Sequence, residues 1–168
     1  MQITVQVEPK GGAPPDVEYR WDADTAILTA NLADATRETA GGSGSVELAG
    51  NDGSWLILDV KEGNLHGVEV AVWPDLKKRP TLAPPAEAEI VRLVVPAKGS
   101  APGVQLLQMD TTVVAEADSQ ETTIHFRLGA ARAARTVRIA RDMLIDVDDH
   151  HVLRGIWLLN VPPFPTDE

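Results

Sequence analysis

Apolar and polar residues alternate along several short stretches of this sequence, which is the period of a half-buried β-strand. The alternation is clearest in residues 3–8 and 123–128, where every second side chain is apolar. Residues 55–60 and 65–72 are two further apolar runs, and residues 61–64 between them supply the Gly and Asn that a tight hairpin turn needs. Neither half of the chain carries a clear helical period, so the pattern predicts an all-β protein.

Related stretches recur in the two halves of the chain. Residues 3–9 align with residues 90–96, and residues 65–74 align with residues 153–162 at nearly the same shift, so that a glycine and two prolines coincide. A recurrence of this kind is typical of a repeated structural unit. The sequence therefore predicts an internal duplication.

The expected architecture consists of two tandem copies of a small antiparallel β unit, residues 1–84 and residues 88–168. Each copy should contain about five or six short strands. Because one such unit alone buries little of its surface, we expect the copies to pack with pseudo-twofold symmetry, as a sandwich or a partly open barrel. Residues 82–86 contain two adjacent prolines and form an extended linker, across which we expect few contacts.

Residues 127–141 fit two local structures. Residues 129–135 are rich in alanine and arginine, which are good helix formers. Val137 and Ile139, in contrast, alternate with more polar neighbours as in a strand. We expect a strand, with a short helix as the alternative.

The last apolar run of the chain is apolar on both of its faces. Trp157, Leu159 and Val161 make its second face apolar, and Trp73 does the same at the end of the corresponding run in the first half. Burying such a side chain contributes about 1.5–3 kcal/mol. We therefore predict that these four residues form an interface, either between the two copies or with another subunit of a homodimer or an unknown protein partner.

Composition and charge argue against several classes of protein. The chain has 168 residues, a net charge of −10 and no cysteine. Negative charge repels nucleic acids and anionic membranes, and the lack of cysteine removes disulfides, thiolate nucleophiles and Cys-ligated zinc. No apolar run approaches the ~20 residues of a membrane span, and no secretion signal is recognisable. We expect a cytoplasmic protein that binds neither nucleic acid nor membranes.

Arginine stands out against this acidic background. Residues 127–141 contain five arginines and no acidic residue. Four of them follow one another at a spacing of three, namely Arg132, Arg135, Arg138 and Arg141. Since guanidinium groups bind carboxylates and phosphates through paired hydrogen bonds, these four arginines are candidate ligand-binding residues for an anion or for an acidic patch on a partner. Ion pairs with acids of the same chain, or exposure to water, are the alternative.

The densest polar cluster lies near the end of the second half. Asp146, Asp148 and His150 are candidate ligands for a divalent metal such as zinc or manganese. A solvated hairpin tip explains the same residues without a metal, and no other cofactor is expected. His125 has no serine or cysteine partner in a recognisable motif, and we interpret it as an exposed side chain.

Three segments of the first half resemble a family of short, uncharacterised bacterial β proteins. They are Tyr19-Arg-Trp-Asp-Ala-Asp24, Leu58-Asp-Val60 and Leu65-His-Gly-Val-Glu-Val70. The second half matches less well, because it lacks the opening tyrosine. The resemblance implies a small β fold without an established activity, and it contributes no catalytic residues.

These observations leave three hypotheses about function. The first is a non-enzymatic β protein that acts as an interaction or ligand-binding module. The second is a metal-dependent or acid/base enzyme that uses the acidic hairpin of residues 146–151. The third is an acidic immunity or inhibitor protein for a basic partner, which rests on the net charge alone.

Overall fold

The computed structural model describes residues 3–33, 43–95, 105–130 and 134–165 of the chain. These residues form 14 strands and no helix, so the predicted all-β class is confirmed. Accordingly, the described part contains no helix that could cross a membrane.

The strands divide equally between the two halves of the chain. Those of the first half are β1 (Gln6–Pro9), β2 (Val17–Asp22), β3 (Ile27–Leu32), β4 (Ser43–Gly50), β5 (Trp55–Lys61), β6 (Asn64–Val72) and β7 (Leu76–Lys78). Those of the second half are β8 (Glu89–Val94), β9 (Gln105–Thr111), β10 (Val113–Ala117), β11 (Ile124–Leu128), β12 (Ala134–Ala140), β13 (Met143–Asp148) and β14 (Leu153–Leu158).

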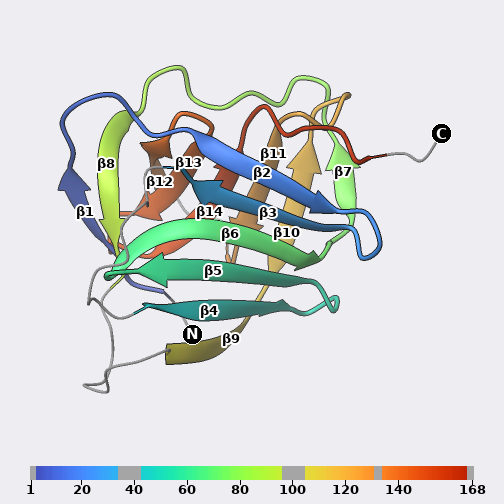
Figure 1. Ribbon diagram of the computed structural model, residues 1–168, viewed down its shortest axis with the longest axis horizontal. Helices are drawn as coiled ribbons and strands as arrows, with labels where there is room; N and C mark the ends of the chain where they lie inside the picture. The colour runs from blue at the N-terminus through green and yellow to red at the C-terminus, as the bar shows by residue number, and fades with distance from the viewer. Residues whose placement is uncertain (1–2, 34–42, 96–104, 131–133, 166–168) are drawn as a thin grey trace.

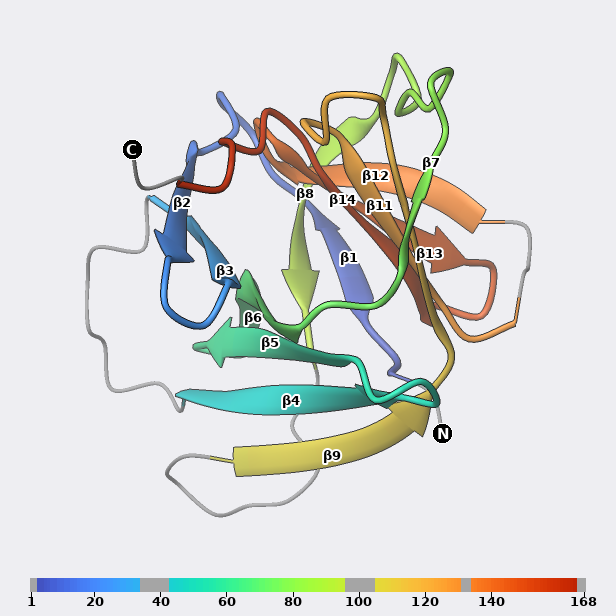
Figure 2. The same ribbon diagram turned by 90° about the vertical axis from the view of Figure 1, so that its right-hand side faces the viewer.

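Hydrogen bonds join these strands into one continuous, curled sheet. Its order is β7-β10-β11-β14-β13-β12-β8-β6-β5-β4-β9, with β1 added to β8 and the β2–β3 hairpin added to β6. Figures 1 and 2 show β2–β6 on one side of the molecule and β10–β14 on the other, with β1 and β8 bridging them. The open, half-barrel curl agrees with the partly open barrel among the predicted architectures.

The space enclosed by the curled sheet is filled by apolar side chains from both halves. Leu28, Leu58, Phe126, Ile145 and Ile156 are all at most 1% exposed and belong to one buried cluster. In β3 and β11 these buried positions alternate with more exposed ones, as the sequence pattern predicts. The two halves therefore share a single core.

Strand pairing crosses the linker of residues 82–86 in several places. β9 of the second half pairs in parallel with β4 of the first half. β7 of the first half likewise pairs in parallel with β10 of the second half. In addition, β8 of the second half pairs with β1 and with β6 of the first half. The expectation of few contacts across the linker is therefore not met. The exchanged strands cover edges that each half would otherwise leave unpaired.

Residues 127–141, for which we expect a strand with a short helix as the alternative, contain strands where the structure describes them. Residues 124–128 form β11 and residues 134–140 form β12, which confirms the expected strand and leaves no helix among the residues described there. Each half contributes seven described strands rather than five or six. The excess includes β7 and β9, which pair in parallel with the opposite half and carry no clear alternation of their own.

The two halves arrange their consecutive strands in the same order. The order is β2-β3-β6-β5-β4 in the first half and β10-β11-β14-β13-β12 in the second. The register shifts after Asp59 in the β5–β6 pair and after Asp146 in the β13–β14 pair. A glycine lies opposite each of these aspartates, Gly67 and Gly155 respectively.

Candidate functional site

A pocket of about 440 Å³ lies on the face of β10–β14 that points away from the core. The strand period explains its polar lining: Ile124, Phe126 and Leu128 alternate with His125 and Arg127, so the second pair projects from the opposite face. The remaining lining residues are Val114, Leu128, Gly129, Ala130, Ala134, Asp146, Arg154 and Trp157. The pocket thus combines charged groups with apolar walls.

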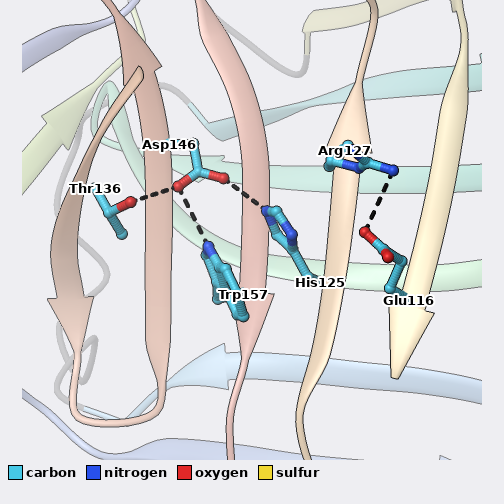
Figure 3. A network of polar contacts seen from close by, with 6 residues as sticks. All are labelled: Glu116, His125, Arg127, Thr136, Asp146 and Trp157. Atoms are coloured by element: carbon cyan, nitrogen blue, oxygen red, sulfur yellow. Dashed lines mark hydrogen bonds and ion pairs between the residues drawn. The ribbon is translucent and has the colours of Figure 1, made fainter. Parts of the chain in front are cut away.

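Asp146 is the centre of a hydrogen-bond network in this pocket (Figure 3). His125 Nε2 lies 2.7 Å from its Oδ2 atom, while Thr136 Oγ1 and Trp157 Nε1 donate to Oδ1 at 2.7 and 3.2 Å. Burial raises the pKa of Asp146, but the hydrogen bonds from His125 and Thr136 outweigh burial and lower it. Because an ionised carboxylate only accepts hydrogen bonds, the contact places a proton on His125 Nε2.

His125 is held on two sides rather than exposed. Its ring stacks on Trp157 with 3.9 Å between the ring centroids and 12° between the planes, and its side chain is only 12% exposed. The interpretation of His125 as an exposed histidine is therefore wrong. The cause is sheet order, because β11 and β13 both pair with β14 and bring residues 21 positions apart together across it.

Gly155 permits this contact across β14. A Cβ atom at this position would lie 2.2 Å from Asp146 Oδ2 and 3.1 Å from His125 Nε2. Both separations are shorter than a side chain can tolerate without movement of the pair. The His125–Asp146 contact therefore requires the absence of a side chain at Gly155.

A second charged pair stands beside this network. Arg154 is 8% exposed, and its Nε donates to Asp148 Oδ2 at 2.8 Å. The backbone N–H groups of His150 and Val152 donate to the other oxygen of Asp148. Burial raises the pKa of Asp148, but the hydrogen bonds from Arg154 and these two backbone groups outweigh it and lower the pKa to about 2. Asp148 thus fixes the β13–β14 turn and orients Arg154.

The stability contributed by Asp148 is expected to depend on pH. A carboxylate whose pKa is lowered in the folded state stabilises the protein at pH values above 3.8, its pKa in the unfolded chain. This contribution is lost as the pH falls toward the folded-state pKa of about 2. Asp148→Asn should be less stable than the wild type at neutral pH, and the two should converge in acid. Urea unfolding from neutral to acidic pH measures this. Asp149→Asn is the control, because that side chain is 86% exposed; a constant difference between the wild type and Asp148→Asn would contradict the expectation.

A third group of charges joins the two halves at one side of the pocket. The carboxylate of Glu116 in β10 is 6% exposed and contacts two arginines. Arg79, which follows β7 of the first half, donates to Oε2 at 2.7 Å, whereas Arg127 lies 3.3 Å from Oε1 (Figure 3). Burial raises the pKa of Glu116, but these arginines outweigh burial and lower it. Arg127 remains 47% exposed and also lines the pocket.

The predicted metal ligands do not converge. Asp146 contacts His125, Asp148 contacts Arg154, and the His150 ring is exposed beside Asp149 at 3.7 Å. Nowhere in the described residues do three or more His, Asp or Glu side chains form a group that could hold a metal ion.

The three predicted arginine ligands that the structure describes also lie apart from the pocket. Arg132 is outside the described residues. Arg135 lies 4.0 Å from Glu89, Arg141 lies 3.3 Å from Asp16, and Arg138 donates to the Arg141 carbonyl group. The ion pairs of Arg135 and Arg141 are more than half exposed, so they contribute little. Among the described residues, the arginines that line the pocket are Arg127 and Arg154, which are outside the four that the spacing of three selects.

The predicted interface residues have partners within the chain. Trp157 stacks on His125, and Val161 belongs to the buried core. Trp73 stacks on Trp21 and reaches Phe126 of the second half, with 6.0 Å between the ring centroids. Leu159 is half-buried, and its backbone N–H donates to Asp142. An interface with another subunit remains a prediction.

The signals for the missed residues lie in the strands of the second half. Arg154 is the one charged residue in β14, and all six residues of this strand are buried. Because arginine is rarely buried without a partner, an acidic partner for Arg154 could have been expected. The resemblance to the short bacterial β proteins stays a prediction. Comparison with models of known protein families and with curated protein sequences gave no match.

Proposed function

We propose that this chain is a ligand-binding module that holds a small organic anion in the pocket of its second half. The observation that carries the proposal is the position of Arg154. Its side chain is more than nine-tenths buried, is oriented through Nε by Asp148, and lines the pocket. Among the described residues, the bond to Asp148 is the one hydrogen bond that this guanidinium makes.

A guanidinium group has five N–H donors, of which the Arg154–Asp148 bond uses Nε. Asn31 Oδ1 is the buried side-chain atom without a hydrogen-bond partner among the described residues, so the other N–H groups of Arg154 still reach solvent in the pocket. A carboxylate is the acceptor that a planar guanidinium fits best. Arg127 is half-exposed on the next strand, opposite Gly155 in the β11–β14 register. Two arginines on neighbouring strands can therefore reach the same ligand.

The ligand should also have an apolar part. Val114, Leu128, Ala130, Ala134 and Trp157 contribute apolar wall to the pocket. A volume of about 440 Å³ is within the usual range of small-molecule sites, which are mostly apolar with a few well-placed polar groups. A carboxylate with an aliphatic or aromatic body fits this combination.

Replacing Arg154 by lysine is expected to weaken anion binding at least tenfold. Lysine keeps a positive charge beside Asp148 but lacks the planar set of donors. Isothermal titration calorimetry with hexanoate and benzoate measures the effect. Arg135→Gln is the matched control, since Arg135 is 58% exposed and lies apart from the pocket, and it should bind like the wild type. Equal affinities of the two variants, or no binding by the wild type, would refute the proposal.

A second candidate function is acid/base catalysis without a metal, which the His125–Asp146 contact favours. A carboxylate that orients a histidine by accepting from one ring nitrogen leaves the other nitrogen available for proton transfer. Conversion of bound anions during the calorimetric experiments would favour this candidate. The acidic-inhibitor role, the homodimer and the cytoplasmic location stay predictions.

The predicted duplication, with copies in residues 1–84 and 88–168, also stays a proposal. It is supported by the common strand order, the register shifts after Asp59 and Asp146, and the antiparallel pairing of β1 with β8. If the copies are related, the first one lacks the site. His125 lies opposite Trp157 in the β11–β14 pair. The equivalent positions of the first copy are Thr29 and Glu69, which lie opposite each other in the β3–β6 pair.

Cutting the chain between its halves is expected to give two fragments that fold only together. Residues 1–84 and 88–168 share a core and exchange strands, so either fragment alone exposes apolar surface and unpaired edges. Circular dichroism of the separate and mixed fragments tests this, with the intact chain as the reference. A native-like cooperative transition of either fragment alone would count against a shared core.

A further inference from the structure

The proposed anion pocket offers a hydrogen-bond acceptor beside its two arginines. His125 Nε2 contacts Asp146 Oδ2 at 2.7 Å, and because the carboxylate only accepts, the proton of the neutral ring is on Nε2. The second ring nitrogen, Nδ1, is then an acceptor. In Figure 3 this nitrogen points away from Asp146. The contact within the chain thus determines which kind of group His125 offers to a ligand.

The Nδ1 atom is available to a ligand. Among the described residues, the contact with Asp146 is the one hydrogen bond of the His125 ring, so Nδ1 has no partner. The buried side-chain atom without a partner in that part of the chain is Asn31 Oδ1, so Nδ1 is accessible to solvent. Since His125 lines the pocket, a ligand there can reach an unused acceptor.

The orientation of this acceptor is fixed before a ligand binds. The His125 ring stacks on Trp157, with 3.9 Å between the ring centroids, and its side chain is 12% exposed. Asp146 is itself held by Thr136 and Trp157, which donate to its Oδ1 atom at 2.7 and 3.2 Å. The ring therefore cannot turn over without losing its bond to Asp146. A preorganised acceptor selects among ligands without the cost of ordering a side chain.

His125 stands close to the arginines that hold the carboxylate in the proposed function. His125 and Arg127 are two residues apart on one face of β11, which places their Cα atoms about 6–7 Å apart. Arg127 lies opposite Gly155, and His125 Nε2 lies 3.1 Å from the position of a Cβ atom at Gly155. The register shift in the β13–β14 pair leaves Arg154, next to Gly155, without an opposite residue and lets it point into the same pocket. A donor group of the ligand should therefore lie near its carboxylate.

We infer that the ligand is a hydroxycarboxylate whose hydroxyl group, on carbon 2 or 3, donates a hydrogen bond to His125 Nδ1 while Arg127 and Arg154 hold its carboxylate. This inference rests on the proposed anion-binding function and adds the hydroxyl group to it. The described lining of the pocket has two arginines and one aspartate, so a neutral hydroxyl donor suits it better than an ammonium group. An ether oxygen in the same place has no hydrogen to donate. The pocket therefore distinguishes hydroxy acids from their ethers and from plain carboxylates.

The inference is tested by calorimetric titration of the full chain with a series of six-carbon acids. The titrations are done at about pH 8, where histidine side chains are ordinarily neutral. The better of 2-hydroxyhexanoate and 3-hydroxyhexanoate should bind about three- to tenfold more tightly than hexanoate, the usual gain from one hydrogen bond. Its O-methyl ether should bind no more tightly than hexanoate. The same should hold for 6-hydroxyhexanoate, whose hydroxyl group lies at the apolar end.

Asp146→Asn reverses the hydrogen-bonding role of the ring while keeping its shape. Thr136 and Trp157 both donate to Oδ1, so the amide oxygen takes that place and the amide N–H group faces His125 Nε2. Nε2 must then accept, which moves the ring proton to Nδ1. A hydroxyl group can still bind to Nδ1–H, and an ether oxygen now can as well. The hydroxy acid and its ether should therefore bind to this variant with Kd values within about twofold of each other, as expected for equal hydrogen bonds.

Arg135→Gln is the matched control and should discriminate between the two ligands like the wild type. Equal binding of hexanoate and both hydroxy acids by the wild type, or an ether or 6-hydroxyhexanoate that binds as tightly as they do, overturns the inference and leaves the anion-binding function standing. Discrimination that persists in Asp146→Asn also overturns it. Absence of binding of every acid in the series overturns both. The comparison of hydroxy acid and ether in the wild type decides the inference even if the variant unfolds.

Discussion

Replacing Phe126 by alanine is expected to lower the free energy of unfolding by about 3–5 kcal/mol. Phe126 is fully buried in β11 and belongs to the core cluster that both halves build. It also approaches Trp73 of the first half, with 6.0 Å between the ring centroids. The substitution therefore removes packing inside the second half and between the halves. Urea unfolding followed by tryptophan fluorescence measures the loss.

Phe164→Ala is the matched control for this variant. Phe164 is 41% exposed and has an edge-on contact with Trp21, so the same truncation should cost no more than about 1 kcal/mol. The wild type should unfold in a single transition, because one core unites the halves. Separate transitions of the two halves, or equal costs of the two truncations, would argue against the shared core.

Gly155→Ala is expected to separate His125 from Asp146. The new methyl group would lie 2.2 Å from Asp146 Oδ2, so the carboxylate must move away from its present position. Forcing a group into a packed site typically costs about 1–3 kcal/mol. The pKa of Asp146 should rise, because it loses its hydrogen bond from His125. Chemical denaturation measures the destabilisation, and NMR titration of the His125 ring and the Asp146 carboxyl group reports the broken contact.

Gly11→Ala provides the control for the added methyl group. Nothing lies within 4 Å of a Cβ atom at Gly11, and its backbone is outside the left-handed region, so its stability should stay within about 0.5 kcal/mol of the wild type. Hexanoate binding should weaken in Gly155→Ala and stay unchanged in Gly11→Ala. If Gly155→Ala keeps the wild-type NMR titration of His125, the glycine is not what permits the contact.

The local period of the sequence was sufficient to predict most of the strands but not their partners. Residues 55–60 and 65–72 are predicted as a hairpin, and the structure forms β5 and β6 there, joined by Glu62 and Gly63 with φ of 55° and 76°. Positive φ at both central residues is what such a two-residue turn requires. β7 and β9 escape prediction because their parallel partners lie in the opposite half, and sequence period carries no information on such pairing.

The candidate site shows the same limit more sharply. Asp146 stands out in the sequence, but as a metal ligand, because its neighbours in the chain are acidic. Its actual partners come from β11, β12 and β14, so no local pattern could identify them. Asp148 likewise looks like part of a solvated tip, whereas pairing with Arg154 buries it. Chemistry assembled across strands becomes visible only once their order and register are known.

The most direct test of the account is to locate a bound anion by the indole N–H signals of the protein's tryptophans. Trp157 lines the pocket and donates to Asp146, whereas Trp55 is 37% exposed in the first half. Titration of the ¹⁵N-labelled protein with hexanoate should shift the Trp157 indole signal saturably and leave that of Trp55 in place. A Trp157 signal that does not move while hexanoate binds, or saturable shifts confined to Arg135, Arg138 and Arg141, would contradict the assignment of the pocket as the anion site.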